Sequence, residues 1–176
     1  MHLVRGNLFL VGLPGAGKST LGRTLARRLA KTFVDADVEL ERKLGVTIST
    51  IFEIEGESGF RDREEAMLAE LTARADVVLA TGGGAVIRPV NRERLKANGT
   101  VVYLHALPAL LRDRTRHSRH RPLLNAPDPL ARLAELYAVR DPLYREVAAE
   151  VLESDREHIA RFADALENEA RGALQP

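Results

Sequence analysis

A glycine loop that carries a lysine and a serine is the first stretch whose residue types suit chemistry. Residues 12–19 match the pattern G-x-x-x-x-G-K-[ST], with Gly12, Gly17, Lys18 and Ser19 at its fixed positions. Glycines let backbone N–H groups converge on an anion, and a following helix adds positive charge at that point. Lys18 can reach terminal phosphates, and the Ser19 hydroxyl can ligate Mg²⁺. The loop therefore predicts the binding of a nucleotide.

The sequence on either side of the loop supports this interpretation. The apolar run 8–11 predicts a buried strand before it, and leucines at every fourth position predict a helix after it (Leu21, Leu25, Leu29). The order of strand, loop and helix distinguishes a phosphate-binding loop from the alternative, a glycine-rich turn that binds nothing.

Acidic residues and glycines follow two further predicted strands. Asp35 and Asp37 come after residues 32–34, and Gly82, Gly83 and Gly84 come after residues 77–80. Three glycines behind an apolar strand indicate the close approach of a ligand. The aspartates have a plainer alternative, in which one is a helix N-cap and the other a solvated carboxylate.

Two arginines point to an acidic partner. Arg61 and Glu64 are three residues apart, so on a helix they share one face, and a surface ion pair is the plainer interpretation. Arg140 lies much later in the chain. Arginine forks bind carboxylates through two parallel hydrogen bonds, which predicts a small acidic molecule as phosphate acceptor.

Composition limits the classes of protein that fit. The 176 residues are 45% hydrophobic and 29% charged, which is typical of one globular domain over residues 1–176. A net charge of +1 gives no general attraction to nucleic acid or anionic membrane. The absence of cysteine excludes disulfides, thiolate metal sites and thiol catalysis, and is compatible with the cytoplasm. No apolar stretch has the length of a membrane span, and residues 1–14 do not read as a signal peptide.

One basic stretch, residues 112–121, stands out from this neutral background. It is either a nucleic-acid patch or part of a mobile lid, about residues 112–125, that closes on polyphosphate. The stretch is short and lacks aromatic residues, which favours the lid. His117 and His120 have no partners at ligand spacing, so no zinc site is expected.

Strands and helices alternate along the chain, which predicts an α/β fold with a parallel sheet covered by helices on both faces. The carboxyl ends of all strands then meet at one edge, where ligands bind in open α/β sheets. Ser49 is the expected N-cap of the helix 47–55, and Pro142 is expected to begin a new helix. The expected strands are 8–11, 32–34, 77–80, 100–104 and 147–152; the expected helices are 18–30, 38–44, 47–55, 57–74, 91–97, one from 108, 130–138, one from 142, and 158–170.

Taken together, these motifs resemble the shikimate kinase family, in particular its bacterial single-domain members. The matching segments are 12–20 (GLPGAGKST), 34–37 (VDAD), 56–61 (GESGFR), 82–86 (GGGAV), 121–124 (RPLL) and 140–145 (RDPLYR). The resemblance implies a three-layer P-loop kinase fold of the nucleoside-monophosphate-kinase type, with strand order 2-3-1-4-5. It also implies the transfer of phosphate from ATP to the 3-hydroxyl of shikimate, in aromatic amino-acid biosynthesis.

The resemblance further implies roles for the nucleotide site. The ATP phosphates would lie on Gly15, Ala16, Gly17, Lys18, Ser19 and Thr20. Ser19 would bind Mg²⁺ directly and Asp35 through water. Arg121 would reach the transferring phosphate from the lid, and Arg114 would stack on adenine. The segment 154–158 lacks the family's proline, so the adenine contacts there stay open, with Arg156 as the candidate substitute.

For the acceptor, the resemblance implies that Asp37 takes a hydrogen bond from the attacking hydroxyl, as a base or as an orienting group. Arg61 and Arg140 would bind the carboxylate and Glu64 would orient Arg61. The Gly83 backbone would contact the ring, with Gly82 and Gly84 in support. Lys18, Asp37 and Arg121 would be the catalytic residues.

Two other functions fit the same motifs. One is a kinase for another small carboxylated polyol such as gluconate. The other is a kinase-like domain that only senses a small acid, although such a domain has no need to keep Lys18, Ser19 and Asp37. No association motif is evident, so the sequence favours a monomer.

Overall fold

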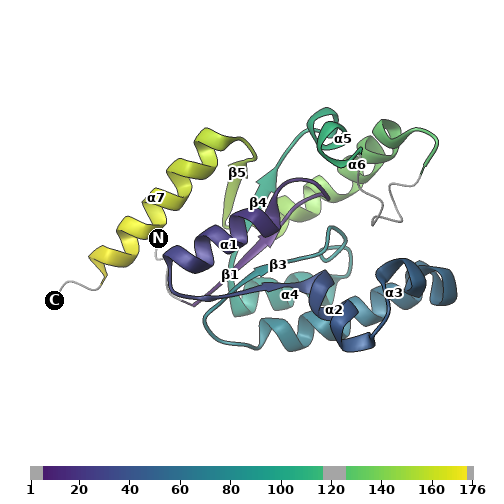
Figure 1. Ribbon diagram of the computed structural model, residues 1–176, viewed down its shortest axis with the longest axis horizontal. Helices are drawn as coiled ribbons and strands as arrows, with labels where there is room; N and C mark the ends of the chain where they lie inside the picture. The colour runs from purple at the N-terminus through teal and green to yellow at the C-terminus, as the bar shows by residue number, and fades with distance from the viewer. Residues whose placement is uncertain (1–5, 117–125, 174–176) are drawn as a thin grey trace.

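The computed structural model describes residues 6–116 and 126–173 (Figure 1). Its centre is a sheet of five parallel strands in the order β2-β3-β1-β4-β5. The strands are β1 (Asn7–Val11), β2 (Thr32–Asp35), β3 (Val77–Ala80), β4 (Gly99–His105) and β5 (Glu150–Glu153). Both the predicted parallel sheet and its strand order are confirmed.

The middle strand, β1, is apolar along its length because both of its faces are covered. Residues 8–11 have no exposed surface. Leu10 lies opposite Ala80 of β3 and Val102 of β4, so the loops after β1 and β3 leave the sheet at the same edge. This register brings the phosphate-loop motif next to the three glycines, as the parallel arrangement predicted.

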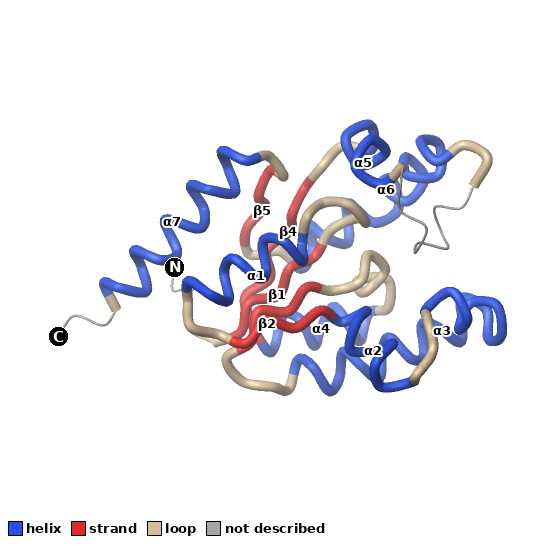
Figure 2. The backbone as a smooth tube through the Cα atoms, viewed as in Figure 1, coloured by secondary structure: helices blue, strands red, loops and turns tan. Residues whose placement is uncertain are grey.

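Helices cover the sheet on both faces, which makes three layers (Figure 2). α1 and α7 pack together on one face, while α4 and α6 lie on the other, with α3 against α4. The short α2 packs on α3 beyond the edge of the sheet. The helices are α1 (Lys18–Arg28), α2 (Ala36–Leu44), α3 (Ile48–Thr72), α4 (Pro89–Asn98), α5 (Pro108–Thr115), α6 (Pro129–Val147) and α7 (Arg156–Gly172).

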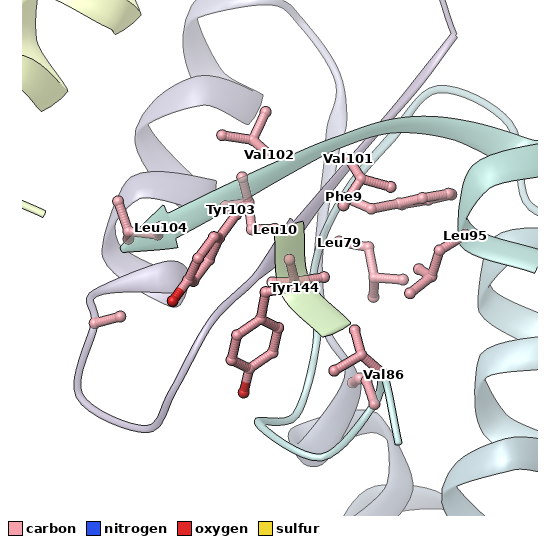
Figure 3. Packing of buried hydrophobic residues seen from close by; sticks show 14 of the residues in the cluster. Phe9, Leu10, Leu79, Val86, Leu95, Val101, Val102, Tyr103, Leu104 and Tyr144 are labelled. Atoms are coloured by element: carbon pink, nitrogen blue, oxygen red, sulfur yellow. The ribbon is translucent and has the colours of Figure 1, made fainter. Parts of the chain in front are cut away.

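The hydrophobic core under α4 and α6 packs these two helices against the strands of the sheet (Figure 3). Phe9 and Leu79 pack there with Leu95 of α4. Tyr103 of β4 and Tyr144 of α6 lie against each other, with ring centroids 4.9 Å apart, and both are almost fully buried. These two tyrosines fix α6 against the sheet.

The expectation that Pro142 begins a new helix is wrong, because α6 runs without interruption from Pro129 to Val147. A proline inside a helix costs about 3 kcal/mol because it removes a hydrogen bond and crowds the preceding turn. Leu136, Arg140 and Tyr144 are buried at four-residue intervals on both sides of Pro142. Burial of this single face therefore outweighs the local preference for a break.

Two boundaries also differ from the prediction. Thr47, not Ser49, caps α3, and its side chain accepts a hydrogen bond from the Thr50 N–H. The predicted pair of helical stretches is seen within α3, where Gly56 has a φ of 69° and interrupts the helix. The last strand begins at Glu150, since Val147 still belongs to α6 and packs in the core.

Within the described residues, no helix has both the length and the apolar character that crossing a membrane requires.

Candidate active site

The phosphate loop joins the end of β1 to the start of α1. Gly12 has a φ of 148°, and a Cβ there would lie only 2.6 Å from the backbone oxygen of Leu104. Gly17 occupies the N-cap position of α1 with a φ of 97°, and no side chain caps this helix end. The first turn of α1 also lacks an acidic residue. Its N–H groups are thus left for an anionic ligand, as the motif predicted.

Lys18 folds back across the loop. Its Nζ donates to the carbonyl oxygens of Gly12 at 2.6 Å and of Leu13 at 3.1 Å. These contacts hold the ammonium group over the concave side of the loop. A phosphate placed there would meet the positive charge at short range.

Ser19 and Asp35 face each other across the same end of the sheet. The Ser19 hydroxyl donates to Oδ2 of Asp35 at 2.5 Å. The other carboxylate oxygen, Oδ1, accepts from the N–H groups of Asp37 and Val38 and caps α2. The helix-cap interpretation of Asp35 is therefore correct, and it coexists with the predicted position beside Ser19.

A cavity of about 400 Å³ opens beside these residues. It is lined by the phosphate loop, the Asp35 turn, the start of α3, the β3 end and one arginine of α5 (Pro14, Gly15, Gly17, Lys18, Ser19, Thr20, Asp35, Asp37, Val38, Glu41, Ile48, Thr81, Gly83, Arg114). The structure brings together most of the predicted site residues. Glu41, Ile48 and Thr81 are lining residues that the motifs did not indicate.

Asp37 lines this cavity and also lies near the carboxylate of Glu64 on α3. Burial, together with the nearby carboxylates of Glu64 and Asp35, raises its pKa to about 7. A Cβ on Gly82 would come within 2.8 Å of Asp37 Oδ1 and 2.9 Å of Glu64 Oε2. Only glycine lets the chain pass this close to both carboxylates.

Arg61 and Glu64 form a buried pair, not the surface pair of the plainer interpretation. Their residues are 6% and 5% exposed, and Arg61 donates to Glu64 Oε1 at 2.8 Å and to Glu57 Oε1 at 3.2 Å. Arg61 Nε and Glu64 Oε2 are buried without a hydrogen-bond partner among the described residues. Burial raises the pKa of Glu64, and Arg61 opposes that rise. Unpaired atoms of this kind mark a place for a polar ligand.

Arg140 reaches the same place from α6 and is 3% exposed. Its pKa is lowered by burial and by the like charge of Arg61. An ideal Cβ on Gly83 would lie 3.3 Å from a terminal nitrogen of Arg140, and one on Gly84 would overlap the Arg61 guanidinium. Two desolvated arginines therefore meet at neighbouring glycines, an arrangement that an anion would stabilise.

Sequence reasoning missed two residues that contact the predicted site residues. Tyr144 donates from its hydroxyl to the carbonyl oxygen of Gly83. Ser154 is 3% exposed and holds Arg114, which donates to its hydroxyl and to its carbonyl oxygen, each at 2.6 Å. The available signal for Tyr144 was its position four residues after Arg140, which places both on one helix face.

Arg114 belongs to the nucleotide side. It also reaches the carbonyl oxygens of Gly15 and Ala16 at 3.4 Å, and the Ser154 hydroxyl donates to Ala16 at 2.5 Å. A second cavity of about 360 Å³ lies here and includes Arg156 in its lining. Arg121 and most of the predicted lid lie outside the described residues, which resume at residue 126 after Arg116.

A parallel sheet of this order, with a phosphate loop after its central strand and two buried arginines at the neighbouring glycine turn, defines a P-loop kinase for a small molecule. A family model described as shikimate kinase matches residues 14–170. The chain therefore belongs to the shikimate kinase family, whose members transfer phosphate from ATP to shikimate.

Individual relatives agree with this assignment. A shikimate kinase from Cupriavidus pinatubonensis is 60% identical over 166 residues, which cover 94% of this chain and 86% of that protein. One from Ralstonia nicotianae is 54% identical over 172 residues, which cover 97% and 90%. The solved structure of shikimate kinase from Acinetobacter baumannii in complex with shikimate superposes with a TM-score of 0.90, at 46% identity and over 98% and 97% of the two chains.

A gluconokinase from Sinorhizobium meliloti is similar with a TM-score of 0.54, over 98% of this chain and 95% of that one. Its identity is only 14%, so the likeness extends to the fold alone. The gluconokinase thus shares an architecture with this chain, whereas the shikimate kinases named above also share 46–60% of its sequence.

Proposed function

We propose that this chain binds ATP on the phosphate loop and phosphorylates the 3-hydroxyl of shikimate, held between α3, the turn 82–84 and α6. The observation that carries the proposal is the meeting of buried Arg61 and Arg140 at Gly83 and Gly84. A carboxylate fits two adjacent guanidinium groups, each able to donate a pair of parallel hydrogen bonds. Asp37 and the phosphate loop border the adjoining cavity, where the reacting groups would meet.

Magnesium fits the residues at the nucleotide end. Ser19 and Asp35 place a hydroxyl and a carboxylate oxygen 2.5 Å apart, and both are hard oxygen donors of the kind Mg²⁺ prefers. Ser19 would be the direct ligand and Asp35 would hold the ion through water. When bound, the ion supplies charge neutralisation on the phosphates.

The chain's own residues provide the remaining electrostatics. Lys18 neutralises charge on the transferring group, and Arg121 adds a second cation from the lid at about residues 112–125. Asp37 accepts the hydrogen bond of the attacking hydroxyl, and a pKa of about 7 suits a group that takes a proton near neutral pH. Glu64 keeps Arg61 in place through their 2.8 Å contact.

The adenine end is formed by Arg114 and Arg156, which both line the second cavity. Ser154 holds the Arg114 guanidinium against the phosphate loop, and Arg156 is the candidate substitute for the family's proline-containing turn. The chain acts as one kinase domain over residues 1–176, as a monomer in the cytoplasm, with no nucleic acid or membrane partner.

The test is ATP turnover, measured by ADP release, with shikimate, gluconate and the neutral amide of shikimate as acceptors. We expect shikimate to be the best substrate. Arg61→Ala and Arg140→Ala should each lose roughly ten- to a hundredfold in kcat/KM for shikimate, because each removes a charge-assisted contact. Lysine at either position should rescue only part of the loss, since it keeps the charge without the fork.

The amide makes the test specific. If the arginines bind the carboxylate, the change from acid to amide should lower kcat/KM much more in the wild type than in Arg61→Ala, because both changes remove one shared interaction. Losses that simply add at both positions would contradict the proposed acceptor site. Equal turnover of gluconate would contradict the choice of substrate.

A further inference from the structure

Tyr144 connects two elements of the proposed acceptor site, α6 with Arg140 and the glycine turn 82–84. Its side chain is fully buried against Tyr103 (Figure 3). Its hydroxyl donates to the carbonyl oxygen of Gly83, and the positive charge of Arg140, one helical turn earlier in α6, acts on this hydroxyl.

The direction of this hydrogen bond follows from the groups involved. A carbonyl oxygen can only accept, a guanidinium can only donate, and a tyrosine hydroxyl has one hydrogen. The Tyr144 hydrogen therefore goes to Gly83, and its oxygen faces the positive field of the Arg140 guanidinium. Burial raises the pKa of Tyr144, so the hydroxyl keeps its hydrogen at neutral pH.

This hydrogen bond ties two elements that could otherwise move independently, α6 and the glycine turn 82–84. The peptide between Gly83 and Gly84 joins two residues without side chains, and glycine backbone turns easily. Its carbonyl oxygen is held by Tyr144, and the whole peptide unit follows because it is planar. The Arg140 guanidinium lies against the same peptide, 3.3 Å from the place of an ideal Cβ on Gly83, so fixing the peptide also fixes the surface on which the arginine rests.

We propose that Tyr144 is a positioning residue for the acceptor, which aligns the Arg140 guanidinium with the Gly83 peptide so that both contact one substrate molecule. This inference rests on the proposed function, since it assigns Tyr144 a part in holding shikimate. Tyr144 acts through Arg140 and Gly83 and need not touch the substrate itself.

Tyr103 provides a matched control. It lies against Tyr144 in the same core, and its hydroxyl also bonds to α6, donating to Asp141 at 2.8 Å. Asp141 is held in turn by Arg145. Removing either hydroxyl takes one buried hydrogen bond from the same helix, but only the Tyr144 hydroxyl contacts the acceptor elements.

The experiment compares wild type, Tyr144→Phe and Tyr103→Phe for the KM of shikimate, the KM of ATP, kcat and the urea midpoint of unfolding. We expect Tyr144→Phe to raise the KM of shikimate roughly tenfold, with the KM of ATP changed less than about twofold. Tyr103→Phe should lower the urea midpoint at least as much as Tyr144→Phe does, because the hydrogen-bond partner of the Tyr103 hydroxyl is charged. Both KM values of Tyr103→Phe should stay within about twofold of the wild-type values. A purely structural role would make the two variants alike in kinetics.

A double-mutant cycle adds a second readout. If Tyr144 works by aligning Arg140, the losses of Tyr144→Phe and Arg140→Lys in kcat/KM should be less than additive. An unchanged KM of shikimate in Tyr144→Phe, equal KM changes in both tyrosine variants, or simple additivity would each overturn the inference while wild-type turnover of shikimate stands. A wild type without shikimate turnover would instead overturn the proposed function itself.

Discussion

The nucleotide half and the acceptor half of the site are built in opposite ways. The nucleotide half, residues 12–19 with Asp35, is made from neighbouring stretches of chain whose polar groups pair with each other. Lys18 bonds to carbonyls five and six residues before it, and Ser19 bonds to Asp35. A phosphate that enters this half exchanges existing hydrogen bonds for new ones.

The acceptor half, formed by Arg61, Glu64, the turn 82–84, Arg140 and Tyr144, draws on three distant segments and is left incomplete. Arg61 Nε and Glu64 Oε2 are buried without a hydrogen-bond partner among the described residues. Each such atom costs about 1–3 kcal/mol. The comparison shows where the fold carries a cost for function: the acceptor half buries an Arg61 N–H without a partner among the described residues, and a carboxylate can accept from it.

The largest effect should come from Lys18→Ala in the nucleotide half. Its charge acts on the transferring phosphate, so kcat should fall about a thousandfold, which corresponds to about 4 kcal/mol of transition-state stabilisation. Steady-state turnover with shikimate measures this, and the unfolding midpoint should change little. Lys43→Ala is the control, since Lys43 is exposed and pairs with Glu70 away from the site. Near-normal kcat in folded Lys18→Ala would show that the loop does not serve phosphate transfer.

Asp37→Asn tests through stability whether the fold also carries a cost at the buried carboxylate beside Glu64 and Asp35. The folded-state pKa of Asp37 is about 7, above its ordinary value of 3.8, so the folded state binds the extra proton between these values. Wild-type stability should therefore fall as pH rises from about 4 to 7, and this contribution should be flat above 7. The asparagine side chain of the variant does not titrate in this range. The free energy of unfolding of the variant should therefore rise relative to that of the wild type by about 3 kcal/mol over this range.

Urea unfolding from pH 4 to 8, without nucleotide or metal, measures this difference in the free energy of unfolding. Parallel curves for the two proteins would mean that the Asp37 carboxylate carries no cost in the folded state.

Gly84→Ala should give the smallest of the three effects and should fall on the acceptor alone. Its Cβ would overlap the Arg61 guanidinium, which is buried and held by Glu64 and Glu57. Arg61 must then shift, and kcat/KM for shikimate should fall roughly thirtyfold, or about 2 kcal/mol. ATP affinity without acceptor, measured by calorimetry, should stay the same. Gly172→Ala is the control, because a Cβ there meets open space. A matching loss of ATP affinity in Gly84→Ala would remove the distinction between the halves.

Much of the fold was predictable because its signals are local. The strand that leads into the phosphate loop is a run of four apolar residues, and Gly45 ends α2 in the left-handed conformation that glycine favours. Pro142 and Val147 were misread because local preference pointed one way and burial of one face of α6 pointed the other. In both cases the tertiary contact decided.

By itself, the sequence determined the chemistry of the nucleotide half, since a phosphate loop is a continuous motif whose backbone geometry follows from its glycines and the helix behind it. The Arg61–Glu64 pair was likewise predictable from a three-residue spacing. Only the tertiary structure decided that this pair is buried and that Asp35 both caps a helix and faces Ser19. It alone showed that Tyr144 bonds to Gly83, 61 residues away, and that Ser154 bonds to Ala16, 138 residues away. The physical reason is that burial and long-range hydrogen bonds depend on how distant elements pack. Neither produces a periodic pattern in the sequence around the residues that make them.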